Sequence, residues 1–141
     1  MSTILRVREL YKLYGEGDER APVLQKVSFD VERGSFVCVM GPSGSGKSTL
    51  LHLVSGLDVP DAGSVELDGR NLAKLSSRET TLLRRDAIGH VFQFFNLLPN
   101  LTVLENVGLP IAIAGERPAA REDELVRLLG RFGLGKKTKC F

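Results

Sequence analysis

Residues 41–48 constrain the fold of this chain more than any other stretch. A glycine is followed by four residues and then by Gly-Lys-Ser, which is the spacing of a phosphate-binding loop. Residues 36–40, just before the loop, are apolar and rich in valine, so they predict a strand buried on both faces. Residues 50–57 carry leucine and valine at helical spacing, which predicts a buried helix after the loop. Strand, glycine loop and helix form the context that this spacing needs.

The residue types in the loop suit the capture of a polyphosphate. Gly41, Gly44 and Gly46 lack a Cβ atom and tolerate positive φ, so the main chain can curl closely around an anion. Free N–H groups and the positive dipole end of the helix starting near Lys47 would point at the phosphates. Lys47 would reach the β- and γ-phosphates, and the Ser48 hydroxyl would be a ligand of Mg²⁺. The predicted nucleotide-binding residues of the loop are Gly41, Pro42, Ser43, Gly44, Ser45, Gly46, Lys47, Ser48 and Thr49.

Two other interpretations of the glycine-rich stretch fit less well. A flexible Gly/Ser linker is not expected between a buried strand and a buried helix. A dinucleotide-binding fingerprint would need a third small glycine or alanine where the chain has Thr49. Phosphate binding is therefore the preferred interpretation.

Composition and charge narrow the class of protein. The chain has 141 residues, 43% of them hydrophobic and 26% charged, which is enough for one modest globular core. A net charge of +2 gives no argument for a nucleic-acid partner or an acidic membrane surface. No apolar run is long enough to cross a bilayer and the N-terminus lacks a signal-peptide core, so we expect a cytosolic protein. Cys38 and Cys140 do not suggest a disulfide framework, and neither histidine has metal-ligand spacing with them.

Hydrophobic patterning and turn residues predict the remaining elements. Two early strands joined by a short turn suggest an antiparallel sheet ahead of the nucleotide core. A loop is expected at 15–22, and the last helix should begin after Pro118 and stop at Gly133. The predicted strands are 3–10, 27–31, 36–40, 65–67 and 88–92; the predicted helices are 50–57, 75–86, a stretch from 103 that Pro110 interrupts, and 119–132; residues 135–141 are expected to be a loose tail.

Several linked motifs give the chain a family resemblance. The chain resembles the ATP-binding subunit of an ABC transporter, of the lipoprotein-release and macrolide-export type, from about Leu10 to Leu134. The resemblance implies an α/β P-loop NTPase of ABC type over residues 1–141, with an antiparallel β subdomain, an incomplete nucleotide core and the start of a helical subdomain. The motifs read Gly41-Pro-Ser-Gly-Ser-Gly-Lys-Ser-Thr-Leu-Leu, Gly56-Leu-Asp-Val-Pro-Asp-Ala-Gly63, Gly89-His-Val-Phe-Gln-Phe-Phe-Asn-Leu-Leu-Pro99 and Glu105-Asn-Val-Gly-Leu-Pro110.

The resemblance assigns two further roles. Tyr14 matches the aromatic residue that stacks on adenine, with Tyr11 as the rival candidate. Gln93, which follows Lys47 by 46 residues, matches the Q-loop glutamine, whose amide contacts Mg²⁺ or the attacking water. Lys47 and Gln93 are thus the expected catalytic residues, and Ser48 and Gln93 the expected metal ligands. Residues 94–98 are expected to contribute to the contact with the membrane subunit.

Three family motifs are absent from the sequence. We find no Leu-Ser-Gly-Gly-Gln signature loop, no apolar strand ending in Asp-Glu with the catalytic base, and no switch histidine. The chain therefore resembles the first half or so of an ATPase domain, and hydrolysis by this chain alone is not expected. The family function is to bind ATP and Mg²⁺, dimerise head-to-tail and hydrolyse ATP to power a membrane permease. That function implies a cytoplasmic protein held at the inner face of the cell membrane by the permease.

Two alternatives from other functional classes remain open. A non-catalytic nucleotide-binding module would bind ATP but show no turnover under any pairing. The head segment of a DNA-repair or chromosome-structure ATPase would carry a long insertion between Lys47 and Gln93 and a basic stripe. The compact spacing and the absence of such a stripe count against the second alternative, so no nucleic-acid partner is expected.

Overall fold

The computed structural model describes residues 2–17 and 20–141. These residues fall into two compact units, Met1–Arg84 and Arg85–Phe141, and each is described here by itself. The first unit contains the phosphate-binding loop, and the second contains Gln93.

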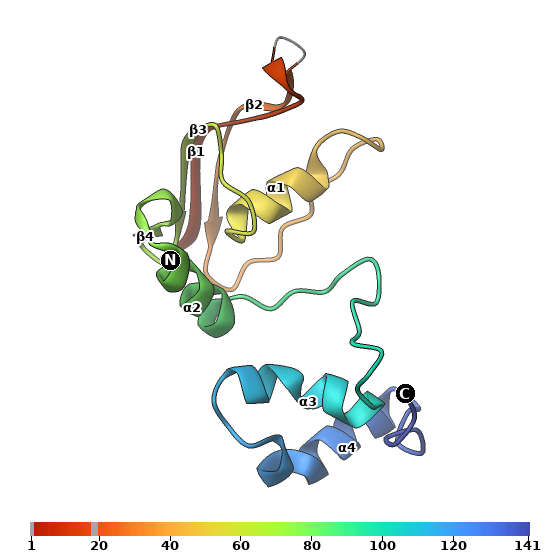
Figure 1. The fold of residues 1–141 in the computed structure, drawn as a ribbon. Helices are drawn as coiled ribbons and strands as arrows, with labels where there is room; N and C mark the ends of the chain where they lie inside the picture. The colour runs from red at the N-terminus through yellow and green to blue at the C-terminus, as the bar shows by residue number, and fades with distance from the viewer. Residues whose placement is uncertain (1, 18–19) are drawn as a thin grey trace. The chain divides into compact units, whose positions relative to one another are not determined.

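A four-stranded antiparallel sheet forms the framework of the first unit (Figure 1). Its spatial order is β2-β1-β3-β4, so the long strand β1 pairs with β2 on one side and β3 on the other. The expected antiparallel portion is confirmed, although β1 and β2 are longer than predicted and the 15–22 loop is correspondingly shorter. Asp18 and Glu19 of that loop lie outside the described residues. The strand bounds are Thr3–Tyr14 for β1, Ala21–Glu32 for β2, Ala62–Leu67 for β3 and Arg70–Asn71 for β4.

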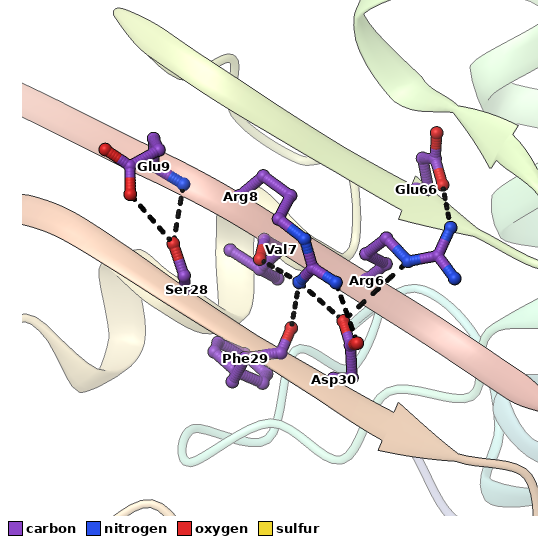
Figure 2. A network of polar contacts seen from close by, with 8 residues as sticks. All are labelled: Arg6, Val7, Arg8, Glu9, Ser28, Phe29, Asp30 and Glu66. Atoms are coloured by element: carbon purple, nitrogen blue, oxygen red, sulfur yellow. Dashed lines mark hydrogen bonds and ion pairs between the residues drawn. The ribbon is translucent and has the colours of Figure 1, made fainter.

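Charged side chains tie the three long strands together across one surface of the sheet (Figure 2). Arg8 on β1 donates two hydrogen bonds to the Asp30 carboxylate on β2, at 2.6 and 2.7 Å. Arg6 on β1 donates to Glu66 on β3 at 3.1 Å. The hydrogen bonds from Arg8 hold the pKa of Asp30 below its ordinary value. These side chains are exposed, so solvent screens each pair and it adds little to the stability.

The hydrophobic core of the first unit lies between the sheet and helix α1, Lys47–Val54 (Figure 1). α1 confirms the predicted helix, although it ends at Val54, short of residue 57. Val7 and Leu10 of β1 both reach this core although they are three residues apart, because the register of the strand shifts between them. The buried residues of this core are Val7, Leu10, Leu24, Leu50, Leu53 and Val65.

Two predicted strands are wrong. Residues 36–40 and 88–92 form no strand, with Phe36 94% exposed and Val91 fully exposed. Cys38 is exposed as well, where a buried strand would have covered it. A strand that is buried on both faces needs sheet neighbours and covering helices. Among residues 2–17 and 20–141 no strand pairs with either segment.

After the sheet, the chain forms a short 3₁₀ turn and a helix. The turn η2 covers Leu72–Lys74, and α2 covers Ser77–Ala87. The predicted helix 75–86 is confirmed, but only one of its two expected anchors is buried: Leu83 is covered and Leu82 is exposed.

The second unit is helical. α3 spans Val103–Ile113 and continues through Pro110, so the predicted interruption is wrong. Proline removes one N–H donor, but Pro110 lies in the last turns of the helix, where its own carbonyl still accepts from Ala114 at 3.0 Å. The last predicted helix forms as a 3₁₀ turn η3, Pro118–Arg121, followed by α4, Glu122–Arg131.

Backbone hydrogen bonds fix the C-terminal end of α4 and the N-terminal end of α3. Gly133, at φ +74°, ends α4 as predicted: Leu134 N–H donates to the Leu129 carbonyl at 2.8 Å, in a Schellman arrangement. Of the predicted apolar face of α4, Leu125 and Leu129 are buried, while Leu128 and Phe132 are exposed. The tail is not loose, because the carbonyls of Cys140 and Thr138 accept from the first two N–H groups of α3 at 2.8 and 3.0 Å.

Candidate nucleotide-binding site

The phosphate-binding loop leads directly into α1. Gly44 and Gly46 adopt φ of +78° and +86°, the left-handed region that favours glycine. Gly41 does not adopt a positive φ. Instead, a Cβ atom on Gly41 would come within 2.8 Å of the Ser45 Oγ. The loop is closed by a hydrogen bond from the Ser45 N–H to the Pro42 carbonyl at 3.3 Å.

Gly46 is also the point where the loop packs on the sheet. A Cβ atom there would lie 2.8 Å from Leu24 Cδ2 and 3.0 Å from the Val23 carbonyl oxygen, both on β2. Leu24 belongs to the core, so the start of α1 is seated against a well-packed part of the unit. Only glycine combines this close approach with the positive φ.

The Lys47 ammonium lies inside the curve of the loop. Its Nζ donates to the carbonyls of Gly41 and Pro42 at 3.0 and 2.6 Å and contacts the Ser45 Oγ at 3.3 Å. Lys47 is the first residue of α1, whose N-cap Gly46 makes no side-chain capping hydrogen bond. The structure therefore joins a positive charge, curled backbone and the positive end of a helix dipole in one place, as anion binding requires.

The two hydroxyl residues after Lys47 lie in the first turn of α1. Ser48 is exposed and Thr49 is half-buried. The helix is already closed at Leu50, whose N–H donates to the Gly46 carbonyl at 2.8 Å. With a polyphosphate bound at the loop, a hydroxyl at this position would suit Mg²⁺, which accepts oxygen ligands and is usually held by few protein groups together with phosphate oxygens.

Tyr14 stands at the end of β1 with 45% of its surface exposed. Its hydroxyl donates to Asp58 Oδ2 at 2.9 Å, and the Lys12 ammonium lies 5.3 Å from the ring centroid. Sequence reasoning predicted neither Asp58 nor Lys12 as a partner of Tyr14. The acidic side chain of Asp58, in the turn after α1, was the signal that could have indicated a hydrogen bond to the hydroxyl. The rival Tyr11 is half-buried within β1 and pairs with Ala62 of β3.

Gln93 lies in the second unit, in a bend rather than at the end of a strand. Its side chain is exposed, and the flanking rings of His90 and Phe92 stack with centroids 5.4 Å apart. Because Gln93 and the phosphate-binding loop belong to different units, its roles at the nucleotide and the metal stay predictions.

The residues after Gln93 border an apolar groove within the second unit, of about 640 Å³. Asn106 of α3 fixes this segment: its Oδ1 accepts from the Leu98 N–H at 2.8 Å, and its Nδ2 donates to the carbonyls of Leu98 and Leu101 at 3.0 Å. The groove is lined mainly by apolar side chains, among them Phe94, Phe95, Leu97, Leu98, Val107, Leu129 and Phe141.

A glycine-rich loop that opens a helix, with its lysine inside the curve, defines a P-loop domain. Residues 24–140 match the family model described as "ABC transporter", so the chain belongs to the ABC transporter family. The resemblance inferred from the sequence is therefore confirmed.

Individual relatives agree with the family assignment. The chain is 43% identical to the lipoprotein-releasing system ATP-binding protein LolD of Alcanivorax borkumensis, over 96% of this chain and 60% of that protein. It is also 43% identical to the macrolide export ATP-binding/permease protein MacB of Marinobacter nauticus, over 95% of this chain and 21% of that protein. The chain thus spans at most about 60% of these curated relatives.

Solved structures show the same fold. The ATP-binding cassette MJ0796, in a dimeric post-hydrolysis state bound to ADP and Pi, superposes with a TM-score of 0.87 at 37% identity, covering 96% of this chain and 60% of that one. The expected fold class, an ABC-type P-loop domain with an antiparallel β portion and the start of a helical part, is confirmed. None of the described helices has the length and apolarity needed to cross a membrane.

Proposed function

We propose that this chain is the nucleotide-binding part of an ABC transporter ATPase and binds Mg-ATP at residues 41–49. The observation that carries the proposal is the Lys47 ammonium, held within the loop by the Gly41 and Pro42 carbonyls at the start of α1. The two carbonyls hold the Lys47 ammonium within the loop, at the place where a bound polyphosphate would lie. Phosphate oxygens can then replace the carbonyl oxygens as acceptors of its hydrogen bonds. A cation beside uncapped helix N–H groups suits a polyanion far better than a neutral ligand.

Each site residue then has a distinct task. Backbone N–H groups of the loop bind the phosphates, Lys47 balances their charge, and the Ser48 hydroxyl is a ligand for Mg²⁺. Bound Mg²⁺ neutralises charge on the phosphate oxygens. Tyr14 contacts the base, and Gln93 orients water or contacts the metal. Residues 41–49 and Gln93 lie within the stretch that matches the family model, residues 24–140, which supports their assignment. Tyr14 lies outside that stretch, and its assignment is supported by its exposed position at the end of β1.

The proposal extends to hydrolysis and to two partners. The relatives are named as ATP-binding components of export and lipoprotein-releasing systems, and the MJ0796 cassette is described as a dimer after hydrolysis. We therefore propose ATP hydrolysis coupled to a membrane permease and a head-to-tail dimer for the protein that contains this chain. The apolar groove beside residues 94–98 is the proposed part of the permease contact.

Calorimetric titration with Mg-ATP tests the central claim. The Lys47→Ala variant should bind about 10- to 100-fold more weakly than the wild type, because a charge-assisted contact to phosphate is lost. Lys74→Ala is the matched control, because Lys74 ends the η2 turn away from the loop, and it should bind like the wild type. Equal affinity of the Lys47→Ala variant and the wild type would contradict the assignment of the phosphate-binding loop.

A further inference from the structure

A compact polar cluster surrounds Tyr14 at the end of β1. Asp58, in the loop after α1, accepts the Tyr14 hydroxyl at 2.9 Å through one oxygen and the Lys12 ammonium at 2.8 Å through the other. Lys12 also donates to the Val59 carbonyl at 2.8 Å, and the Val59 N–H donates to Asp58 at 2.7 Å. One carboxylate therefore joins the aromatic residue, a cation and the loop backbone.

This cluster is more enclosed than the other ion pairs of the sheet. Only 12% of the Lys12 side chain and 31% of the Asp58 side chain are exposed. Burial alone would raise the pKa of Asp58, but hydrogen bonds from Lys12, Val59 and Tyr14 together lower it. The carboxylate thus stays charged and holds its three donors.

The neighbouring Asp61 anchors the same loop to the strand. Its carboxylate accepts from the Leu13 N–H at 2.9 Å, and its own N–H donates to the Tyr11 carbonyl at 3.0 Å. Arg20 adds a contact at 2.6 Å. The backbone on the N-terminal side of Tyr14 is therefore fixed to the loop that carries Asp58, so the Tyr14 ring is restrained at both its backbone and its hydroxyl.

The restraints leave one side of the ring for a ligand. The Lys12 ammonium lies over one face, 5.3 Å from the centroid, while 45% of Tyr14 remains exposed. A flat base can therefore stack only on the opposite face. We propose that Asp58 and Lys12 are positioning residues that hold the Tyr14 ring as a one-sided platform for the nucleotide base. This inference rests on the proposed function, because it concerns the same bound nucleotide.

A base platform and a phosphate-binding loop have separable effects on affinity. Stacking on an aromatic side chain acts on the base and makes no contact with the phosphates. Loss of the platform should weaken binding of ATP while leaving inorganic tripolyphosphate unaffected. A merely structural role of Asp58 would instead weaken both ligands together, because the loop after α1 would be displaced.

The test compares ATP and tripolyphosphate affinities, both with Mg²⁺, for the full chain, four single variants and one double variant. Tyr14→Ala should lose about 5- to 100-fold in ATP affinity, the range expected for one stacked base. Asp58→Asn and Tyr14→Phe should each lose less, about 3- to 10-fold, because the ring remains but is less well held. Tripolyphosphate affinity should not change in any of them. Asp68→Asn, an exposed acid paired with Arg33 at the turn after β3, is the matched control and should leave both affinities unchanged.

Tyr14→Phe removes the hydroxyl of this hydrogen bond, and Asp58→Asn replaces its charged acceptor by a neutral amide, so both act on the same contact and the double variant should be little weaker than Tyr14→Phe alone. Tyr14→Phe also covers the case in which Asp58→Asn fails to fold, because it removes only one hydroxyl. Unchanged ATP affinity in Tyr14→Phe, or equal losses for ATP and tripolyphosphate, would overturn the positioning role. A wild-type chain that binds neither ligand would instead refute the proposed function itself.

Discussion

Gly46 offers the sharpest test of how the loop is built, because two separate penalties meet there. An alanine at φ +86° would adopt the left-handed conformation, which costs roughly 1–2 kcal/mol. Its Cβ would also lie 2.8 Å from Leu24 Cδ2 and 3.0 Å from the Val23 carbonyl oxygen. Overpacking of this kind costs about 1–3 kcal/mol. The Gly46→Ala variant should therefore lose about 2–5 kcal/mol of stability.

Gly44→Ala separates the two penalties within the same loop. Gly44 has a similar φ of +78°, but a Cβ atom there would meet nothing within 4 Å. Its substitution should thus cost only the conformational part, roughly 1–2 kcal/mol. Urea unfolding followed by circular dichroism measures both variants. With slopes of about 1–3 kcal/mol per molar urea, the midpoints of the two variants should differ by on the order of 1 M.

Comparing the two variants tests whether the close approach of the loop to β2 is what restricts position 46 to glycine. If the free energies of unfolding of the Gly46→Ala and Gly44→Ala variants agree within about 0.5 kcal/mol, the close approach is not what restricts Gly46. A Gly44→Ala variant that is the less stable of the two would refute the packing argument outright.

Three further outcomes follow from the contacts described. Thr102→Ala should destabilise the second unit by about 1 kcal/mol in urea unfolding, because it removes the α3 capping box; Thr102→Ser, which keeps the hydroxyl, should cost clearly less. Asn106→Ala should cost about 1–3 kcal/mol and speed hydrogen exchange at the Leu98 amide, since that N–H loses its acceptor; the exposed Asn100→Ala should do neither. The pKa of Asp58 is lowered by folding, so its contribution to stability is present above its ordinary value of 3.8 and is lost as the pH falls through the lower folded value. Acid titration of stability should therefore be shallower for Asp58→Asn, and an unchanged acid slope would contradict the charged cluster.

Hydrophobic alternation and turn residues in the sequence predicted those helices, strands and turns whose formation depends on a few neighbouring residues. The alternation of Val27, Phe29 and Val31 predicted β2, and Gly133 predicted the end of α4. Such signals report the conformational preferences of a few neighbouring residues, which decide turns, caps and amphipathic elements. Residues 36–40 show the limit of this reasoning. Their apolar composition states a preference for burial, but a strand also needs partners, and the sequence pattern does not supply them.

Part of the candidate site was predictable from the sequence and part of it was not. The spacing of residues 41–48 located the loop, Lys47 and the start of α1, because all of them are neighbours in the chain. The cluster around Tyr14 was not predictable, because Lys12 and Asp58 are 46 residues apart and no local pattern links them. Only the antiparallel sheet and the loop after α1 bring the two together.

Helices α1 and α3 have different N-cap residues, and this difference bears on which helix start could bind an anion. At α3, Thr102 accepts the N–H of Glu105, and the tail carbonyls accept the N–H groups of Val103 and Leu104, so the first turn is satisfied within the protein. At α1, the N-cap Gly46 carries no side chain that could play this part, and the Lys47 ammonium lies beside the turn. A helix whose first N–H groups already have acceptors has no donors to offer a ligand. The two caps thus favour α1 over α3 as the place where the proposed polyphosphate would bind.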